Sequence, residues 1–264
     1  MKYEIAIPSY KRSKTLKEKT LSLLTKHNIN PDLVTIFVAN EEELKIYTNE
    51  LKDTPYKKFV VGEVGIGAIR RFTQKYYPEG AYVMNFDDDL QECFVKIDDK
   101  TMVPVGNLEQ DVIIRGFTAC LENNAYLFGI YAAANPMFMK NRVAVGLYYC
   151  IGSCWGLINR HDSDLTVLLD DKEDFERTLQ HYVKDSKVVR LDDITVKSKY
   201  YTEEGGMQVT RTTERILKSA ENLVERFPGL CTMYIRETTG HAELRLRDNR
   251  KEVTTGSTLD QFFG

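Results

Sequence analysis

The chain has 264 residues, of which 42% are hydrophobic, and its formal net charge at pH 7 is −3. This length and composition suffice for one large globular domain, or for one domain with a C-terminal extension, and they exclude a disordered or low-complexity protein. No apolar run reaches the roughly 20 residues that cross a bilayer, and the N-terminus lacks the apolar core of a signal peptide. We therefore expect a protein without membrane segments that works in the cytoplasm, or in the host cytoplasm if it is viral.

The cysteines and the charge balance argue against two further classes of protein. The five cysteines are an odd number, and their spacing matches no zinc site, so we expect reduced, half-buried thiols rather than a disulfide framework. The slightly acidic balance does not indicate a nucleic-acid-binding protein, although a local basic patch would be sufficient for that role.

The first strand and the loop after it are typical of a nucleotide-binding α/β fold. The pattern predicts a strand at 3–8 and an amphipathic helix at 16–27. A strand, a polar loop and a helix form the opening unit of such folds. In the loop, Tyr10 could stack on a nucleobase and Arg12 could bind a phosphate through two parallel hydrogen bonds. The alternative is an ordinary turn with a solvated basic face.

A glycine-rich helix start comes next in the chain. It follows a predicted strand, helix and short strand at 33–39, 41–51 and 59–61. Gly65 and Gly67 lead into a helix that runs to about residue 77 and carries Arg70 and Arg71 in its first turns. This is not the dinucleotide fingerprint, because the third glycine is missing. Backbone N–H groups at such a start can still approach an anion, so we predict a second phosphate-facing element.

The most informative stretch is a buried strand at 82–86 that leads directly into Asp87, Asp88 and Asp89. Burying an unpaired carboxylate is costly, so three adjacent acids indicate a counter-charge such as a divalent cation. A catalytic magnesium is typically held by one or two carboxylates plus substrate phosphates. Strand geometry would place Asp87 and Asp89 on one side, against the metal, and Asp88 on the other, facing a second ligand group. An acidic surface turn is the alternative.

The middle of the chain predicts further strands and a helix around an aromatic segment. These elements are a hairpin at 93–97 and 101–105, a helix at 111–123, and strands at 126–133 and 148–159. Tyr148, Tyr149 and Trp155 in the last strand belong either to the core or to the border of a pocket.

A second group of acids opens a later helix. Phe175 and Leu179 repeat at helical spacing, so the helix begins near 170–171. Glu173 and Asp174 then lie in its first turn, where the helix macrodipole favours the charged form. Acids are common in first turns for that reason alone. The functional hypothesis is a general base that takes a proton from an acceptor hydroxyl.

The C-terminal part predicts strands, a helix and a glycine-containing loop. The strands lie at 188–191, 194–196 and 231–235, and the helix lies at 214–227. The loop at 197–208 contains Gly205 and Gly206 and is suited to a lid. Beyond residue 240, four basic side chains form either a basic patch or a solvated face: Arg245, Arg247, Arg250 and Lys251.

Taken in chain order, the loop at 8–12, the helix start at 67–71, the acids at 87–89 and the pair at 173–174 resemble a GT-A glycosyltransferase, the fold of nucleotide-sugar-dependent transferases. The resemblance covers about residues 1–200. It implies an α/β, Rossmann-related mixed central sheet flanked by helices, in a catalytic domain at 1–200. Residues 201–264 would then form a C-terminal extension of helix and strand packed on that domain.

The resemblance also implies a role for each matching residue. The residues that would bind the donor nucleotide and its phosphates are Pro8, Ser9, Tyr10, Arg12, Gly67, Arg70, Arg71 and Asp88. Asp87 and Asp89 would hold Mn²⁺ or Mg²⁺, and the Glu173–Asp174 pair would supply the base, with Asp174 itself taking the proton. Many members complete the metal shell with a histidine after the base helix. None lies between 182 and 240 here, so His181, His241 or water would have to serve.

The segments YEIAIPSYKR and YVMNFDDDL, with the Gly-Gly-Met after the base helix, resemble more narrowly the TET-associated glycosyltransferases. These are bacteriophage and eukaryotic domains linked to sugar transfer onto hydroxymethylated pyrimidines in DNA, such as 5-hydroxymethylcytosine. The resemblance implies a UDP-sugar donor and a DNA acceptor, with Lys197, Lys199, Arg245 and Arg247 as candidates for binding its backbone. The alternatives are a nucleotidyltransferase with similar acids and metal, and a non-catalytic scaffold that binds nucleotide or DNA. The sugar, the stereochemistry and the oligomeric state stay open.

Overall fold

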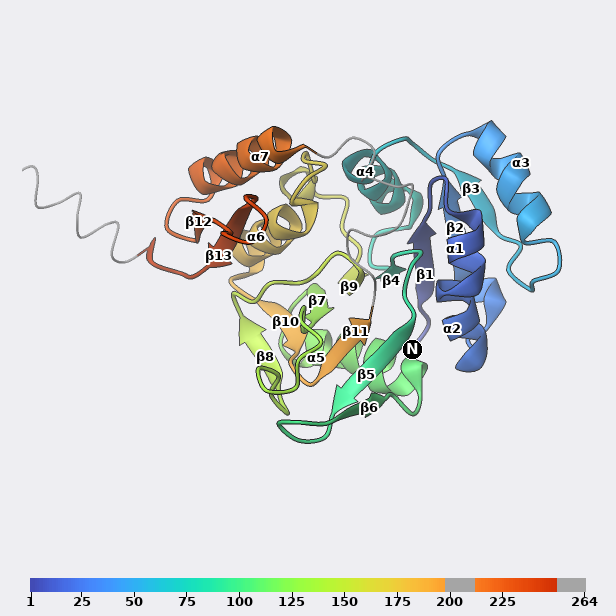
Figure 1. The fold of residues 1–264 in the computed structure, drawn as a ribbon, viewed down its shortest axis with the longest axis horizontal. Coiled ribbons are helices and arrows are strands. Elements are labelled where there is room, and N and C mark those ends of the chain that lie inside the picture. Colours follow the sequence, from blue (N-terminus) through green and yellow to red (C-terminus); the bar gives the residue numbers. More distant parts are fainter. Residues whose placement is uncertain (198–211, 251–264) are drawn as a thin grey trace, which may run out of the picture.

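A computed structural model of the protein describes residues 1–197 and 212–250 (Figure 1). Most of the loop predicted as a lid, together with Lys199 and Lys251, therefore lies outside the described residues. Within the described ranges, no helix combines the length and the apolar character that a membrane span requires.

The central feature is a mixed sheet of eight strands in the order β3-β2-β1-β4-β9-β7-β10-β8. Its strands are β1 (Glu4–Pro8), β2 (Val34–Val38), β3 (Phe59–Val61), β4 (Tyr82–Phe86), β7 (Leu127–Ile130), β8 (Val143–Gly146), β9 (Cys154–Ile158) and β10 (Val188–Leu191). Strand β1 is parallel to β2 and β4, whereas β9 runs antiparallel between β4 and β7. The prediction of a mixed central sheet is confirmed.

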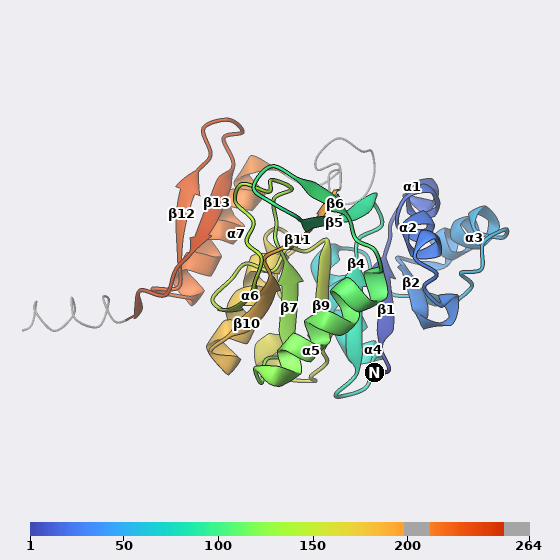
Figure 2. The same cartoon turned by 90° about the horizontal axis from the view of Figure 1, so that it is seen from below.

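Helices cover both faces of this sheet. They are α1 (Ser13–Glu18), α2 (Thr20–Lys26), α3 (Glu41–Glu50), α4 (Ile66–Tyr76), α5 (Arg115–Glu122), α6 (Glu173–Asp185) and α7 (Thr213–Arg226), with short helical turns η1 (Pro31–Leu33), η2 (Glu109–Ile114) and η3 (Ser163–Leu165). Helix α5 packs across β7, β9 and β10, as Figure 2 shows.

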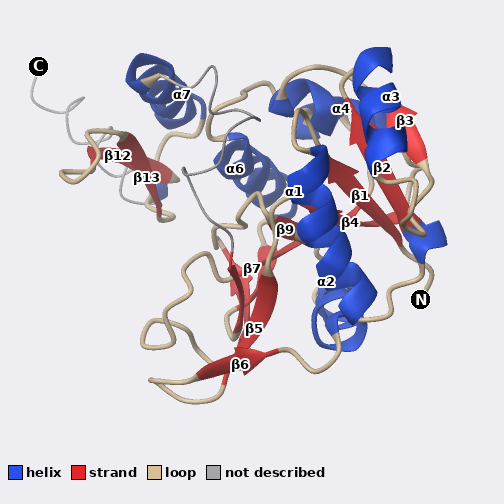
Figure 3. Ribbon diagram, turned by 45° about the vertical axis from the view of Figure 1, so that its right-hand side comes forward, coloured by secondary structure: helices blue, strands red, loops and turns tan. Residues whose placement is uncertain are grey.

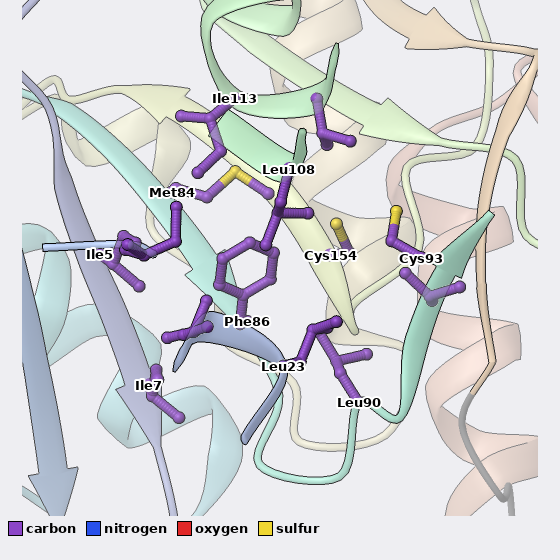
Figure 4. Packing of buried hydrophobic residues seen from close by; sticks show 14 of the residues in the cluster. Ile5, Ile7, Leu23, Met84, Phe86, Leu90, Cys93, Leu108, Ile113 and Cys154 are labelled. Carbon is purple, nitrogen blue, oxygen red and sulfur yellow. The ribbon is translucent and has the colours of Figure 1, made fainter. Parts of the chain in front are cut away.

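The alternation of side chains along β1 explains the two cores. Ile5 and Ile7 pack in the main apolar cluster with residues of α2 and η2, which Figure 4 shows at close range. Ala6 points to the other face, where it packs with Ile69 of α4. Strand β2, an apolar run without alternation, is buried along its whole length because both faces of the sheet are covered.

A smaller sheet lies beside the central one and contains β5 (Glu92–Lys96), β6 (Met102–Pro104) and β11 (Ile194–Lys197) in the order β11-β5-β6. The antiparallel β5–β6 pair agrees with the hairpin expected after the acids. The pairing of β5 with β11, which follows the central strand β10 after a two-residue turn, joins the two sheets.

The C-terminal elements pack on α6 at the end of the molecule away from α3 (Figure 3). They are α7 and an antiparallel pair, β12 (Cys231–Ile235) and β13 (Ala242–Leu246). Phe175 and Leu179 of α6 share one apolar cluster with Leu223 of α7 and Leu244 of β13.

Three strand expectations need correction. The segment 148–159 is a strand only from Cys154 to Ile158, because 147–153 forms an irregular loop. Strand β8 was not predicted, since it lies at the sheet edge and exposes Val143 and Val145 while only Ala144 is buried. Strand β13 was assigned to a charged tail, yet Ala242 and Leu244 alternate inward and are buried.

Candidate active site

Arg70 of α4 connects the end of β4 to the start of α6. One Nη of Arg70 donates to Asp87 Oδ1 at 3.0 Å and to the carbonyl oxygen of Gly152 at 3.2 Å. Its Nε lies 3.6 Å from Glu173 Oε1, and the Arg70 side chain is only 4% exposed. The structure therefore joins three of the predicted site residues, which come from three separate elements.

Asp87 is the first residue beyond β4 and titrates near neutrality. Burial raises the pKa of Asp87 to about 7; Arg70 opposes the rise, and the neighbouring charges of Asp89 and Glu173 add to it. A cation that binds Asp87 would favour its ionised form.

The two acids that open α6 have different surroundings. Glu173 is buried, and its two carboxylate oxygens face Arg70 and Arg177. The Arg177 guanidinium also lies 3.6 Å from the centroid of the Trp155 ring. Glu173 is thus the counter-ion of two arginines.

Asp174 is partly exposed and is held by two hydrogen-bond donors. The hydroxyl of Tyr149 and the backbone N–H of Gly152 both donate to its Oδ2, the latter at 3.3 Å. The Tyr149 ring stacks on Phe175, with centroids 4.1 Å apart and an interplanar angle of 18°. A side chain at Gly152 would approach both Glu173 and Asp174, at 3.1 and 3.5 Å from its Cβ.

The loop after β1 meets the other two acids. Ser9 Oγ donates to Asp88 Oδ2 at 2.6 Å and also contacts the Tyr47 hydroxyl at 2.7 Å. Arg12 lies 3.3 Å from Asp88 and 4.0 Å from Asp89. The expectation that strand alternation would separate Asp88 from Asp89 is wrong, because the chain turns after Phe86 and both carboxylates approach Arg12.

A hollow of about 500 Å³ borders this loop at the start of α3. Tyr10 lines it together with Ser13, Asn40 and Ile46. The Asn40 side chain caps α3 by accepting from the N–H of Glu43, so the wall on that side is anchored. Tyr10 is partly exposed there.

Two predicted phosphate-binding residues contact the chain itself. The N–H of Gly67 donates to Asp170 Oδ1 at 3.0 Å, and Arg71 donates to the carbonyl oxygen of Val167 at 2.9 Å. A Cβ on Gly67 would lie 2.6 Å from the carbonyl oxygen of Leu169, so only glycine fits. The glycine-rich start of α4 thus packs against the segment that precedes α6. The Asp170 carboxylate accepts from the Gly67 N–H, which was expected to bind a phosphate.

The donor atoms at the end of β4 fit a divalent cation that also binds substrate oxygens. Among residues 1–197 and 212–250, no three His, Cys, Asp or Glu side chains gather into a metal-binding group. One or two carboxylates suffice for a cation that keeps water and phosphate ligands, and Asp87 and Asp89 offer these. In the structure the counter-charges expected from a metal come from Arg12 and Arg70.

His181 does not complete such a group. It lies eight residues beyond Glu173 on α6, about 12 Å along the helix axis. Its ring is buried, and Nδ1 is 2.9 Å from the carbonyl oxygen of Arg177. His241 lies between β12 and β13 and contacts Thr213, so it is also outside the β4 end.

His181 should make the fold sensitive to acid. Burial lowers the pKa of His181 to about 4, whereas the unfolded chain binds the proton near pH 6.5. Because the pKa of His181 is lowered in the folded state, its contribution to the free energy of unfolding is fully present above pH 6.5. This contribution is lost as the pH falls toward 4. Relative to a His181→Gln variant, the wild type should lose about 2 kcal/mol of unfolding free energy between pH 7 and pH 5. Urea denaturation at both pH values measures this, and equal losses in the two proteins would contradict it.

Several residues at this site were not predicted for it. Tyr149 and Trp155 were noted only as a possible aromatic border, and Gly152, Arg177 and Tyr47 carried no signal of their own. The Gly-Ser after Ile151 is the one local hint, because a glycine inside a predicted strand often marks a close backbone approach.

No protein-family model and no curated protein matches this chain. Among solved structures, residues 1–349 of S. aureus TarS align with 85% of this chain and 66% of that chain, at 17% identity and a TM-score of 0.52. The same fragment in complex with UDP aligns at 18% identity and a TM-score of 0.51. TarS itself aligns over 40% of its length, also at 0.51.

These likenesses show that the chain has the GT-A fold of glycosyltransferases, as expected from its sequence. The chain spans about two thirds of the TarS fragment and less than half of TarS itself.

Proposed function

We propose that this protein is a glycosyltransferase that moves a sugar from a nucleotide-sugar donor to an acceptor hydroxyl. The observation that carries the proposal is the meeting of Asp87, Arg70 and the Glu173–Asp174 pair at one edge of a GT-A sheet. Ligands of α/β sheets bind outside the carboxyl ends of the strands, which is where these side chains lie. The TarS complex with UDP supports UDP as the nucleotide of the donor.

The donor would lie between the hollow at Tyr10 and the end of β4. Its base would contact Tyr10, and the loop from Pro8 to Arg12, held by Asp88, would shape the site for the ribose and phosphates. A Mn²⁺ or Mg²⁺ ion held by Asp87 and Asp89 would neutralise charge on the departing diphosphate. Arg70 would add a fixed positive charge on the same side.

Asp174 would act as the base. Its carboxylate takes the proton of the acceptor hydroxyl while the acceptor oxygen bonds to the sugar carbon and the bond from that carbon to the diphosphate breaks. The Tyr149 hydroxyl and the Gly152 N–H, which both donate to Oδ2, would fix the carboxylate. Oδ1, which also accepts from the backbone N–H of Phe175, would face the acceptor.

The Tyr149→Phe variant should slow the reaction without weakening the donor complex. Phenylalanine keeps the stacking on Phe175 but removes the hydrogen bond to a charged group, so kcat should fall about tenfold. The KM for the donor should change little, because the hydroxyl contacts Asp174 and none of the residues proposed to bind the donor. Steady-state kinetics with a fixed acceptor separates the two constants, and a raised donor KM with an unchanged kcat would assign Tyr149 to donor binding instead.

For the acceptor we propose a 5-hydroxymethylpyrimidine in DNA, turned out of the duplex to reach Asp174. This part of the proposal rests on the resemblance of the first strand and the acidic strand to the TET-associated enzymes. Incubation of hydroxymethylated and unmodified DNA with donor and Mn²⁺, followed by mass spectrometry of the nucleosides, should show a hexose only on the hydroxymethylated base.

The first experiment is thermal unfolding with a panel of nucleotides, with and without Mn²⁺. A ligand that binds the folded state raises its stability by RT ln(1 + [L]/Kd). A metal-dependent rise with UDP or a UDP-sugar is the expected result. A rise with nucleoside triphosphates alone would favour a nucleotidyltransferase, and no rise with any nucleotide would leave a non-catalytic scaffold.

A further inference from the structure

The segment that contains β7, β8 and β9 carries no acid in its sequence. Between Glu122 and Asp162 the chain has no Asp or Glu, and its only charged side chains are Lys140, Arg142 and Arg160. Strand β7 runs in the same direction as β4, because both are antiparallel to β9. The loop at 131–142 after β7 therefore starts at the same sheet edge as the acids after β4.

This loop is anchored by a buried lysine while its tip exposes two large apolar side chains. Lys96 at the end of β5 is 8% exposed, and its Nζ donates to the carbonyl oxygens of Pro136 at 2.8 Å and Met139 at 2.7 Å. Met137 and Phe138, between these two anchors, are 68% and 60% exposed. In Figure 1 the loop between β7 and β8 lies beside the β5–β6 hairpin that carries Lys96. Met137 and Phe138 are thus exposed on a loop that Lys96 holds on both sides of them.

Arginine and tyrosine side chains continue the surface from the loop toward Asp174. The Arg142 guanidinium lies 5.7 Å from the centroid of the Tyr148 ring. The guanidinium of Arg190, a residue of β10, lies 4.9 Å from the same centroid. Asp192 pairs with both arginines, at 2.8 and 2.6 Å, and orders them. Tyr148 directly precedes Tyr149, whose hydroxyl holds the proposed base, so the surface begins next to the reacting groups.

The basic side chains on this surface are not fully neutralised by carboxylates. Lys140 is exposed, and its ammonium pairs with no carboxylate among the described residues. The Arg142 side chain is 45% exposed beside its buried partner Asp192. The carboxylate that pairs with the two arginines, Asp192, is buried, so the exposed part of this surface consists of cations and aromatic and apolar side chains. Such a surface suits a partner that combines negative charge with flat apolar rings.

We propose that Met137, Phe138, Lys140, Arg142 and Tyr148 form a docking surface for a nucleic-acid strand with unpaired bases. Lys140 and Arg142 contact its phosphates, and Phe138 and Met137 pack against the faces of its bases. The proposal deepens the proposed function, on which it rests, by placing the acceptor strand on one side of Asp174 and the donor on the other.

The test is binding of a short single-stranded oligonucleotide, followed by fluorescence anisotropy at several salt concentrations. The double variant Met137→Ala, Phe138→Ala should bind about 10- to 100-fold more weakly, since base stacking on such side chains contributes that much per base or two. Lys140→Gln should weaken binding for all sequences and reduce the slope of log K against log salt by about one. The matched control is Ile235→Ala, which removes a side chain that is 53% exposed on β12.

Two further measurements separate the possible failures. Heparin, a polyanion without bases, should compete equally with wild type and with the Met137–Phe138 variant. Nucleotide-induced thermal stabilisation should be unchanged in every variant, because none of these residues belongs to the donor site.

Equal loss of affinity in Ile235→Ala, or no loss in the double variant, would overturn the docking surface. Stabilisation by nucleotide without any binding of the oligonucleotide would also overturn it while leaving glycosyl transfer in place. A third outcome is that oligonucleotide binding depends on Met137 and Phe138 but no nucleotide stabilises the protein. This result would contradict the proposed function and support the docking surface.

Discussion

Replacing Asp174 with asparagine should lower the rate of sugar transfer by about 10²- to 10⁴-fold, the usual contribution of a positioned general base. Asparagine has nearly the same shape and still accepts the hydrogen bonds from Tyr149 and Gly152 at its amide oxygen. It cannot take a proton from the acceptor hydroxyl. The variant should therefore fold normally and bind donor as before, and initial rates of product formation at saturating donor measure the loss.

Glu173→Gln is the instructive comparison for Asp174→Asn. Glu173 is buried between Arg70 and Arg177, so removing its charge leaves two buried guanidinium groups with weaker partners. We expect this change to appear first as a lower thermal midpoint, whereas Asp174→Asn should leave the midpoint unchanged. Full turnover by Asp174→Asn, with donor binding intact, would remove Asp174 from the role of base.

The second large effect should come from Arg70→Ala and should fall on stability. Removing one partner of a buried ion pair typically costs about 3–5 kcal/mol, because the other charge is left uncompensated. We expect a value near the lower end, about 3 kcal/mol, since Arg177 would still pair with Glu173 and Asp87 is partly accessible to water. Urea denaturation of wild type and variant gives this difference directly.

Arg71→Ala is the matched control for that experiment. Arg71 is adjacent on the same helix but makes a single hydrogen bond to the carbonyl oxygen of Val167, so its loss should cost about 1 kcal/mol. Similar losses in the two variants would show that Arg70 is no more important to the fold than its neighbour. Arg70→Lys should lie between them, because lysine keeps the charge but cannot reach Asp87, Gly152 and Glu173 together.

Local patterns in the sequence determined most of the elements and the positions of the acids. The apolar run of β2 indicated a strand covered on both faces, and the helical spacing of Phe175 and Leu179 placed Glu173 and Asp174 in a first turn. The strand before Asp87 was equally clear. These predictions hold because they depend on neighbours within one strand or one helical turn, where periodicity reports burial.

Only the tertiary structure decided which charges pair and which residues shape the site. Arg70 meets Gly152 across 82 positions of sequence, and Gly67 meets Asp170 across 103. No periodicity within either segment encodes such a partner, so the sequence alone predicted a divalent cation for the three adjacent acids and no arginine partner. The packing of the loop after β1, of α4 and of α6 against one sheet edge places Arg12 and Arg70 beside these acids, in addition to any metal ion that they bind.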